Sequence, residues 1–222
     1  MNAVGHARGG PLAAPPGHVR HPGRLRHDPE VTFLVPTTDG NRAAVRVSAL
    51  RAGGGARGGV RLEHVTLLTD AQMRKMKGAK MTFGVSTQII FSFAEQDSYS
   101  ANFNDNQYRN AYRLKSYYDG IDRLALSSDT PATTWADPDN VFTSIKAAVT
   151  RRAYNGADIV REQAPTVPQA VLLRTARGAT VPLYEGRLGQ IAPGFEASFI
   201  VLDRDIFSTP AEDVDTISVS ET

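Results

Sequence analysis

The sequence of 222 residues contains no cysteine, which excludes disulfide bridges, thiolate metal ligands and cysteine nucleophiles. It also lacks any run of about 18 apolar residues, so no transmembrane helix is predicted. The amino terminus has no continuous apolar stretch of the kind found in a secretory signal. We therefore expect a cytoplasmic protein that has no membrane partner.

Histidine is scarce outside the segment 1–30, which holds four of the five in the chain. Residues 1–30 are rich in Pro, Gly and Arg and are predicted to be disordered. His18 and His21 have a spacing that a metal site could use, but Gly and Pro leave no rigid frame for the ligands. The arginines could contact phosphates, but too few aromatic residues accompany them for a nucleic-acid platform, so no nucleic-acid partner is expected.

From residue 31 onward, strand-like and helix-like patterns alternate, which predicts an α/β fold with a parallel sheet. Four βα units would form half of an eight-stranded barrel or most of a doubly wound sheet. Neither G-x-G-x-x-G nor a P-loop follows any expected strand, so those kinds of nucleotide binding are unsupported. The expected strands are 31–35, 59–65, 80–87 and 123–129, and the expected helices are 41–54, 69–79, 106–120 and 139–155.

The last part of the chain has a different pattern. Residues 165–180 are predicted to form a helix, and the turn signal Ala-Pro-Gly at 192–194 precedes the apolar stretch 196–203. We expect that stretch to be a strand, and another strand-like stretch ends the sequence. Residues 181–222 are therefore predicted to form a small β unit after the α/β part.

His64 and Asp129 each end an expected strand, two βα units apart. In a barrel the carboxyl ends of the strands converge on one face, so both side chains could reach one pocket. Nitrogen and oxygen ligands suit a zinc-like metal, and a carboxylate can take a proton from water. Two plainer interpretations stay open: Asp129 could simply cap a turn, and a lone histidine is more often structural.

Four stretches resemble, in order, the C-terminal half of the metal-dependent amidohydrolase superfamily. The closest likeness is to the YtcJ-like branch, which includes the N-substituted formamide deformylases. The likeness covers roughly residues 57–222. The stretches are GVRLEHV, KMTFGVSTQ, RLALSSDTPATTWADPDNVFTSIKAAVTRR and GRLGQIAPGFEASFIVLDRDIF.

The resemblance implies a fold and a domain division. Residues 31–180 would form the C-terminal half of a TIM-type (β/α)8 barrel, and residues 181–222 part of a small β-sandwich domain. The family hydrolyses non-peptide carbon–nitrogen bonds, of the amide or formamide type, through a metal-activated water. A small-molecule amide is therefore the implied substrate, and the cofactor is a divalent metal, with zinc favoured.

The resemblance also assigns residues. His64 matches a metal ligand, and Asp129 matches an aspartate that contacts the metal and acts as general base or acid. Arg113 and Trp135 are our candidates for substrate binding, since Arg113 belongs to a loop that covers the pocket in the similar enzymes. A solvent-exposed helix face for Arg113 and core packing for Trp135 are the competing interpretations.

The sequence departs from the family pattern in its ligand set. No H-x-H pair and no metal-bridging lysine are found, and Pro36 stands where the family usually has a histidine. We therefore expect a truncated chain with weak or no activity alone. The alternative is a non-catalytic remnant that acts, if at all, as an interaction module, and a homo-oligomer is left open.

Overall fold

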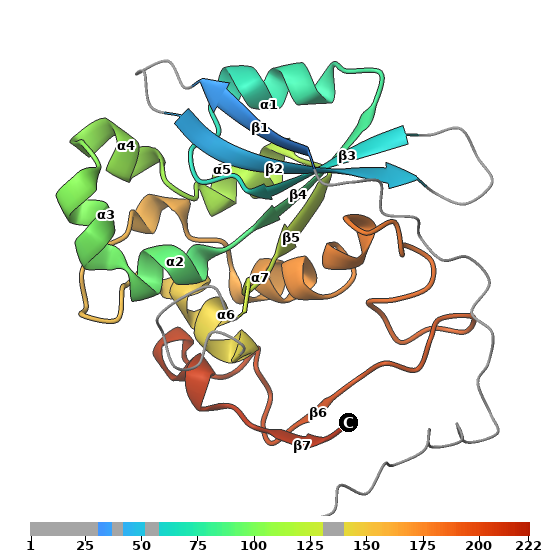
Figure 1. Ribbon diagram of the computed structural model, residues 1–222. Coiled ribbons are helices and arrows are strands. Elements are labelled where there is room, and N and C mark those ends of the chain that lie inside the picture. Colours follow the sequence, from blue (N-terminus) through green and yellow to red (C-terminus); the bar gives the residue numbers. More distant parts are fainter. Residues whose placement is uncertain (1–30, 37–41, 52–57, 131–139) are drawn as a thin grey trace, which may run out of the picture.

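The computed structural model describes residues 31–36, 42–51, 58–130 and 140–222. Its main feature is a five-stranded sheet in the order β1-β2-β3-β4-β5 (Figure 1). The strands are β1 (Val31–Pro36), β2 (Arg42–Arg51), β3 (Gly58–His64), β4 (Thr82–Thr87) and β5 (Arg123–Leu126). The first three strands pair antiparallel, whereas β3, β4 and β5 pair parallel.

The three parallel strands end side by side, and this common end is where the candidate site lies. His64 at the end of β3 lies opposite Thr87 at the end of β4, and Thr87 lies opposite Leu126 at the end of β5. The three strands therefore finish at one edge. Residues that directly follow them, Asp129 included, lie at the same carboxyl edge of the sheet.

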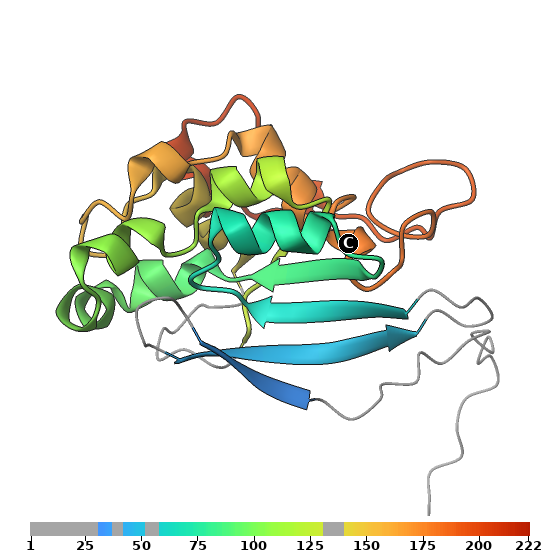
Figure 2. The same cartoon turned by 90° about the horizontal axis from the view of Figure 1, so that it is seen from above.

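Helices surround the β4–β5 side of the sheet, while β1 and β2 lie at the opposite side (Figure 2). They are α1 (Asp70–Lys77), α2 (Ile89–Ala94), α3 (Gln96–Asn102), α4 (Asp105–Asn110), α5 (Leu114–Gly120), α6 (Val141–Thr150) and α7 (Val167–Arg174). Short 3-10 helices accompany them, η1 (Arg161–Gln163), η2 (Gly178–Thr180) and η3 (Ala211–Thr216), and η3 packs against α6. None of the helices in the described ranges is long and apolar enough to cross a bilayer.

The hydrophobic core joins the parallel strands to the helices. Its most deeply buried members come from different elements, and each has essentially no exposed surface: Val85, Ile89, Leu114, Leu124, Ala147 and Leu173. Burying apolar side chains contributes roughly 25 cal/mol for each Å² removed from water, so this core is what holds β4 and β5 in place.

Local signals explain where several helices begin. Thr69 caps α1 by accepting the Gln72 amide proton, while the Gln72 side chain accepts from the Thr69 amide. Thr166 and Gln169 form the same reciprocal capping box at α7. Such a pair satisfies two backbone amide groups that would otherwise lack partners in the first turn. The predicted start of the helix expected over 69–79 is confirmed, with Thr69 as its N-cap.

The predicted helix over 41–54 is wrong, because residues 42–51 form β2. Val45 and Val47 alternate with Arg46 and Ser48, so the segment fits a period of two as well as a helical period. Pairing on both sides decides the conformation, since Val47 lies opposite Val31 in β1 and Leu62 in β3. A regular βα alternation therefore holds only from β3 onward.

Other expected elements are shorter than predicted. The helix expected over 106–120 is divided into α4 and α5, with the positive φ of 46° at Tyr112 between them. The helix expected over 139–155 ends at Thr150, because Arg151 has a left-handed φ of 52°. The strand expected over 196–203 is reduced to β6 (Val201–Leu202), which pairs with β7 (Val219–Glu221).

The α/β class and the parallel β3-β4-β5 sheet are confirmed. Within the described ranges, the sheet runs from β1 at one edge to β5 at the other and does not close on itself. The predicted disordered segment, residues 1–30, lies outside the described residues.

Candidate functional site

His64 and Asp129 lie side by side at the carboxyl edge of the parallel strands. The His64 Nε2 atom is 3.7 Å from the Asp129 Oδ2 atom, although the two residues are far apart in the sequence. Their side chains are 34% and 37% exposed, so both are accessible from solvent and both are partly enclosed. The His64 ring also contacts the Phe91 ring of α2, with 5.9 Å between the ring centroids.

The backbone turns sharply at both residues. His64 and Val65 have φ angles of 67° and 46°, and Asp129 has a φ of 55°. Left-handed backbone costs a residue with a Cβ roughly 1–2 kcal/mol, so surrounding contacts must hold it. Strained backbone of this kind gathers at functional sites more often than elsewhere.

The end of β4 contacts both neighbouring strand ends. Thr87 Oγ1 donates a hydrogen bond of 3.0 Å to the His64 carbonyl. On the other side, the Ser127 amide donates to the Thr87 carbonyl at 2.9 Å, which extends the β4–β5 pairing by one residue. Ser127 Oγ is also 2.8 Å from Ser86 Oγ and accepts a 2.8 Å hydrogen bond from Gln88 Nε2.

An imidazole nitrogen and a carboxylate oxygen at this separation suit a divalent cation such as zinc. The described residues contain no group of three or more His, Asp or Glu side chains that could hold a metal. Catalytic zinc sites use three protein ligands. His64 and Asp129 therefore fit as part of a metal site, and further donors would have to come from elsewhere.

Comparison with known protein families assigns the chain. The profile described as "Amidohydrolase family" matches residues 32–222, which is most of the sequence. The chain belongs to the amidohydrolase family. This membership confirms the resemblance predicted from the strand-end motifs.

An N-substituted formamide deformylase from Arthrobacter pascens is 25% identical to this chain over 146 residues. The match covers 66% of the chain and 26% of the relative, so the chain spans about a quarter of that protein's length. No solved structure matches the chain.

Arg113, one of the two predicted substrate-binding residues, forms hydrogen bonds to other residues of the chain. Its Nη2 atom donates to the Leu68 carbonyl at 2.8 Å and to Asp70 Oδ1 at 2.7 Å. The hydrogen bond and charge of Arg113 hold the pKa of Asp70 below its usual range. Arg113 thus fixes the loop that follows β3. Its role toward substrate stays a prediction, and Trp135 lies outside the described residues.

Sequence reasoning did not single out Gln88, Ser86 or Ser127. All three lie at or just beyond the carboxyl ends of β4 and β5, and Gln88 and Ser86 are only 1% and 2% exposed. The available signal was the run of polar residues in VSTQ and LSSD, directly after apolar strand residues. What the sequence could not supply is the register that brings Gln88 to Ser127.

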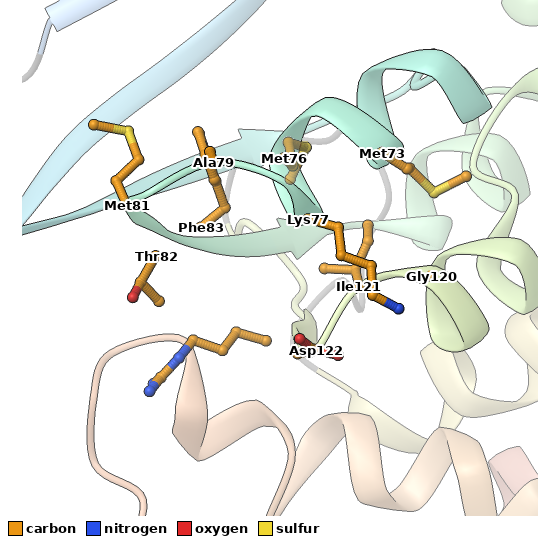
Figure 3. Close-up of a pocket in the computed structure, with 11 residues that line it drawn as sticks. Met73, Met76, Lys77, Ala79, Met81, Thr82, Phe83, Gly120, Ile121 and Asp122 are labelled. Atoms are coloured by element: carbon orange, nitrogen blue, oxygen red, sulfur yellow. The ribbon is translucent and has the colours of Figure 1, made fainter.

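The hollow drawn in Figure 3 lies at the other end of the strands. It has a volume of about 270 Å³ and is lined by Met73, Met76, Met81 and Phe83 together with Lys77 and Asp122. Its lining includes Thr82 and Arg123, the first residues of β4 and β5. In βα barrels this amino end of the strands serves stability rather than chemistry, so the hollow is not the predicted active site.

Proposed function

We propose that this chain is part of a metal-dependent hydrolase that cleaves a non-peptide carbon–nitrogen bond in a small amide. The single observation that carries the proposal is the 3.7 Å approach of His64 Nε2 and Asp129 Oδ2 at the carboxyl edge of parallel strands. Family membership supports the hydrolase class. The name of the Arthrobacter relative favours an N-substituted formamide as the substrate.

His64 Nε2 and the Asp129 carboxylate would hold the divalent ion, and zinc fits this donor pair. The ion, when bound, would lower the pKa of water and polarise the amide carbonyl. Asp129 is partly exposed and can take the proton of a water that attacks the carbonyl carbon. The same carboxyl group then gives that proton to the departing nitrogen as the carbon–nitrogen bond breaks, leaving an acid and an amine.

The remaining donors belong to parts of the enzyme outside the described residues. In this proposal residues 31–180 contribute to a (β/α)8 barrel, and residues 181–222 contribute to a small β-sandwich. The parallel strands β3, β4 and β5 support the first assignment for the chain from residue 58 onward, whereas the antiparallel β1 and β2 do not fit a barrel of parallel strands. The short β6–β7 pair supports the second.

A second candidate function is that of a non-catalytic interaction module. Two observations favour it: the described residues supply only the His64–Asp129 pair, and several large apolar side chains beyond Gly189 are exposed. Ile191 is 87% exposed and Phe207 is 61% exposed. Exposed apolar side chains of this size are typical of contact surfaces when they lie together.

The test of the first function is hydrolysis of an N-substituted formamide by the full chain, with zinc, followed as amine release. Asp129→Asn should lower the rate by about 10²- to 10⁴-fold, because the amide cannot accept a proton. Asp119→Asn is the matched control and should leave the rate unchanged, since Asp119 lies on the exposed side of α5, with its carboxylate 3.9 Å from Lys115. Amine release that survives both a chelator and Asp129→Asn would contradict the hydrolase proposal.

A further inference from the structure

The end of β4 contacts both halves of the candidate site without supplying a metal ligand. Thr87 is fully buried, and its hydroxyl group bonds the carbonyl of His64. Gln88 is 1% exposed, and its Nε2 atom bonds Ser127, two residues before Asp129. β4 is thus the physical connection between the two predicted site residues.

Gln88 makes this bond where a helix cap would be expected. It occupies the N-cap position of α2, yet its side chain forms no cap hydrogen bond. N-cap positions usually carry Ser, Thr, Asp or Asn, whose side chains bond the first turn of the helix. The amide of Gln88 turns instead to the loop that carries Asp129.

The Oε1 atom of Gln88 indicates that packing alone is not the reason for a glutamine at this position. Gln88 Oε1 is buried and has no hydrogen-bond partner among the described residues. A buried acceptor without a partner costs free energy, which an apolar side chain of the same shape would avoid. We therefore attribute the presence of glutamine at this position to the hydrogen bond from its Nε2 atom to Ser127.

We propose that Gln88 is a positioning residue, which holds the Ser127–Thr130 turn so that the Asp129 carboxylate faces His64. The left-handed φ of 55° at Asp129 supports this role, because a strained turn needs contacts that fix it. The catalytic consequence rests on the proposed hydrolase function. The placement of Asp129 by Gln88 is a property of the chain itself and can be measured without metal or substrate.

The first experiment compares Gln88→Met with Gln96→Met in the full, metal-free chain by ¹⁵N relaxation. Gln96 is the matched control, since it is also buried but bonds Asn155, away from the site. Gln88→Met should lower the heteronuclear NOE at Ser127–Thr130 without lowering the thermal midpoint, whereas Gln96→Met should leave that turn unchanged. Unchanged NOE values in Gln88→Met would overturn the proposal.

Ser127→Ala is a second variant, which tests the proposal if Gln88→Met does not fold. It should make the same turn more mobile, because it removes the acceptor of the Gln88 hydrogen bond. A rigid turn in a folded Ser127→Ala chain also contradicts the proposal.

The second measurement is zinc affinity by calorimetry. Loss of a residue that orients a metal ligand typically lowers affinity by about 10- to 100-fold, and Gln88→Met should fall in that range while Gln96→Met stays near the wild type. Equal zinc affinity in wild type and Gln88→Met would overturn the positioning role. A wild-type chain that binds no zinc, but whose turn loosens in Gln88→Met, would contradict the hydrolase function and leave the positioning role intact.

Discussion

Arg151 and Arg152 are adjacent in the sequence, but the first is buried and the second is exposed to solvent. Arg151 is 1% exposed, and its guanidinium group donates to the carbonyls of Val160, Tyr112 and Ala111 at 3.1, 3.0 and 3.5 Å. Burial lowers the pKa of Arg151 to about 10, with nearby Asp158 acting in the opposite direction. Arg152 is about half exposed and lies 3.8 Å from Glu212.

These surroundings predict different effects of the same substitution. Arg151→Ala leaves buried carbonyls without donors and opens a cavity, so the free energy of unfolding should fall by about 3 kcal/mol or more. Arg152→Ala removes an exposed pair and should change it by less than about 1 kcal/mol. Urea denaturation of both variants measures the difference, and equal losses would show that the guanidinium bonds of Arg151 contribute little.

The residue scale also shows what the sequence could predict of the site. His64 and Asp129 were identifiable because parallel strands end at a common edge, so polar residues after two such strands converge. Gln88 and Ser127 were not identifiable as partners, since their bond depends on the register of β4 and β5. Arg113 was expected near substrate from its place in a loop, but the tertiary fold gives it partners in the β3–α1 loop.

At the scale of elements, α5 holds the loop that leaves His64. The buried Tyr117 hydroxyl group accepts from the Leu68 amide at 3.1 Å and donates to the Val65 carbonyl at 3.2 Å. Burial raises the pKa of Tyr117, while its hydrogen bond from Leu68 and the charge of Arg113 act in the opposite direction. Burial likewise raises the pKa of Tyr112 well above its ordinary value.

This arrangement predicts a loss of stability in alkali. A tyrosine whose pKa is higher in the folded state holds its proton more tightly there than in the unfolded chain. Its contribution to the free energy of unfolding is therefore complete below pH 10. As the pH rises above 10, that free energy falls by up to about 1.4 kcal/mol for each pH unit and each such tyrosine. The measurement is the free energy of unfolding between pH 8 and 11.5 in wild type and Tyr117→Phe.

Tyr117→Phe should show a shallower decline above pH 10, because one of the groups that causes it is absent. The lowered pKa of Arg151 opposes the decline in both proteins. Tyr184→Phe is the control, since this ring lies near Arg187, away from the β3–α1 loop. If the free energy of unfolding declined equally with pH in wild type and Tyr117→Phe, this would contradict the role of the buried Tyr117 in holding the β3–α1 loop.

The elements that were predicted wrongly share a physical cause. Residues 42–51 satisfy both periodicities, and pairing with β1 and β3 selects the strand. The 106–120 stretch is interrupted at Tyr112, whose buried hydroxyl group contacts Thr66 and Tyr99. In both cases tertiary contacts override local propensity. The capping boxes at Thr69 and Thr166, which are local, could be read from sequence alone.

At the scale of the whole molecule, the sheet is parallel where the candidate site lies and antiparallel where β1 and β2 begin it (Figure 1). The α/β class was predicted from an alternation of patterns from residue 31 onward, which the structure shows only from β3 onward, and family membership agrees with the class. Barrel closure could not be predicted from the sequence of these strands, because it depends on a partner strand for the β5 edge. The proposed function consequently rests on one geometric fact, the approach of His64 to Asp129.

That fact is tested most directly by a crystal of the full chain grown with zinc and an anomalous difference map collected at the zinc edge. The account predicts one peak about 2.0–2.2 Å from both His64 Nε2 and an Asp129 carboxylate oxygen. It also predicts that the peak disappears in His64→Ala. A map with no peak within coordination distance of either residue, or with zinc bound only at histidines of the segment 1–30, would contradict it.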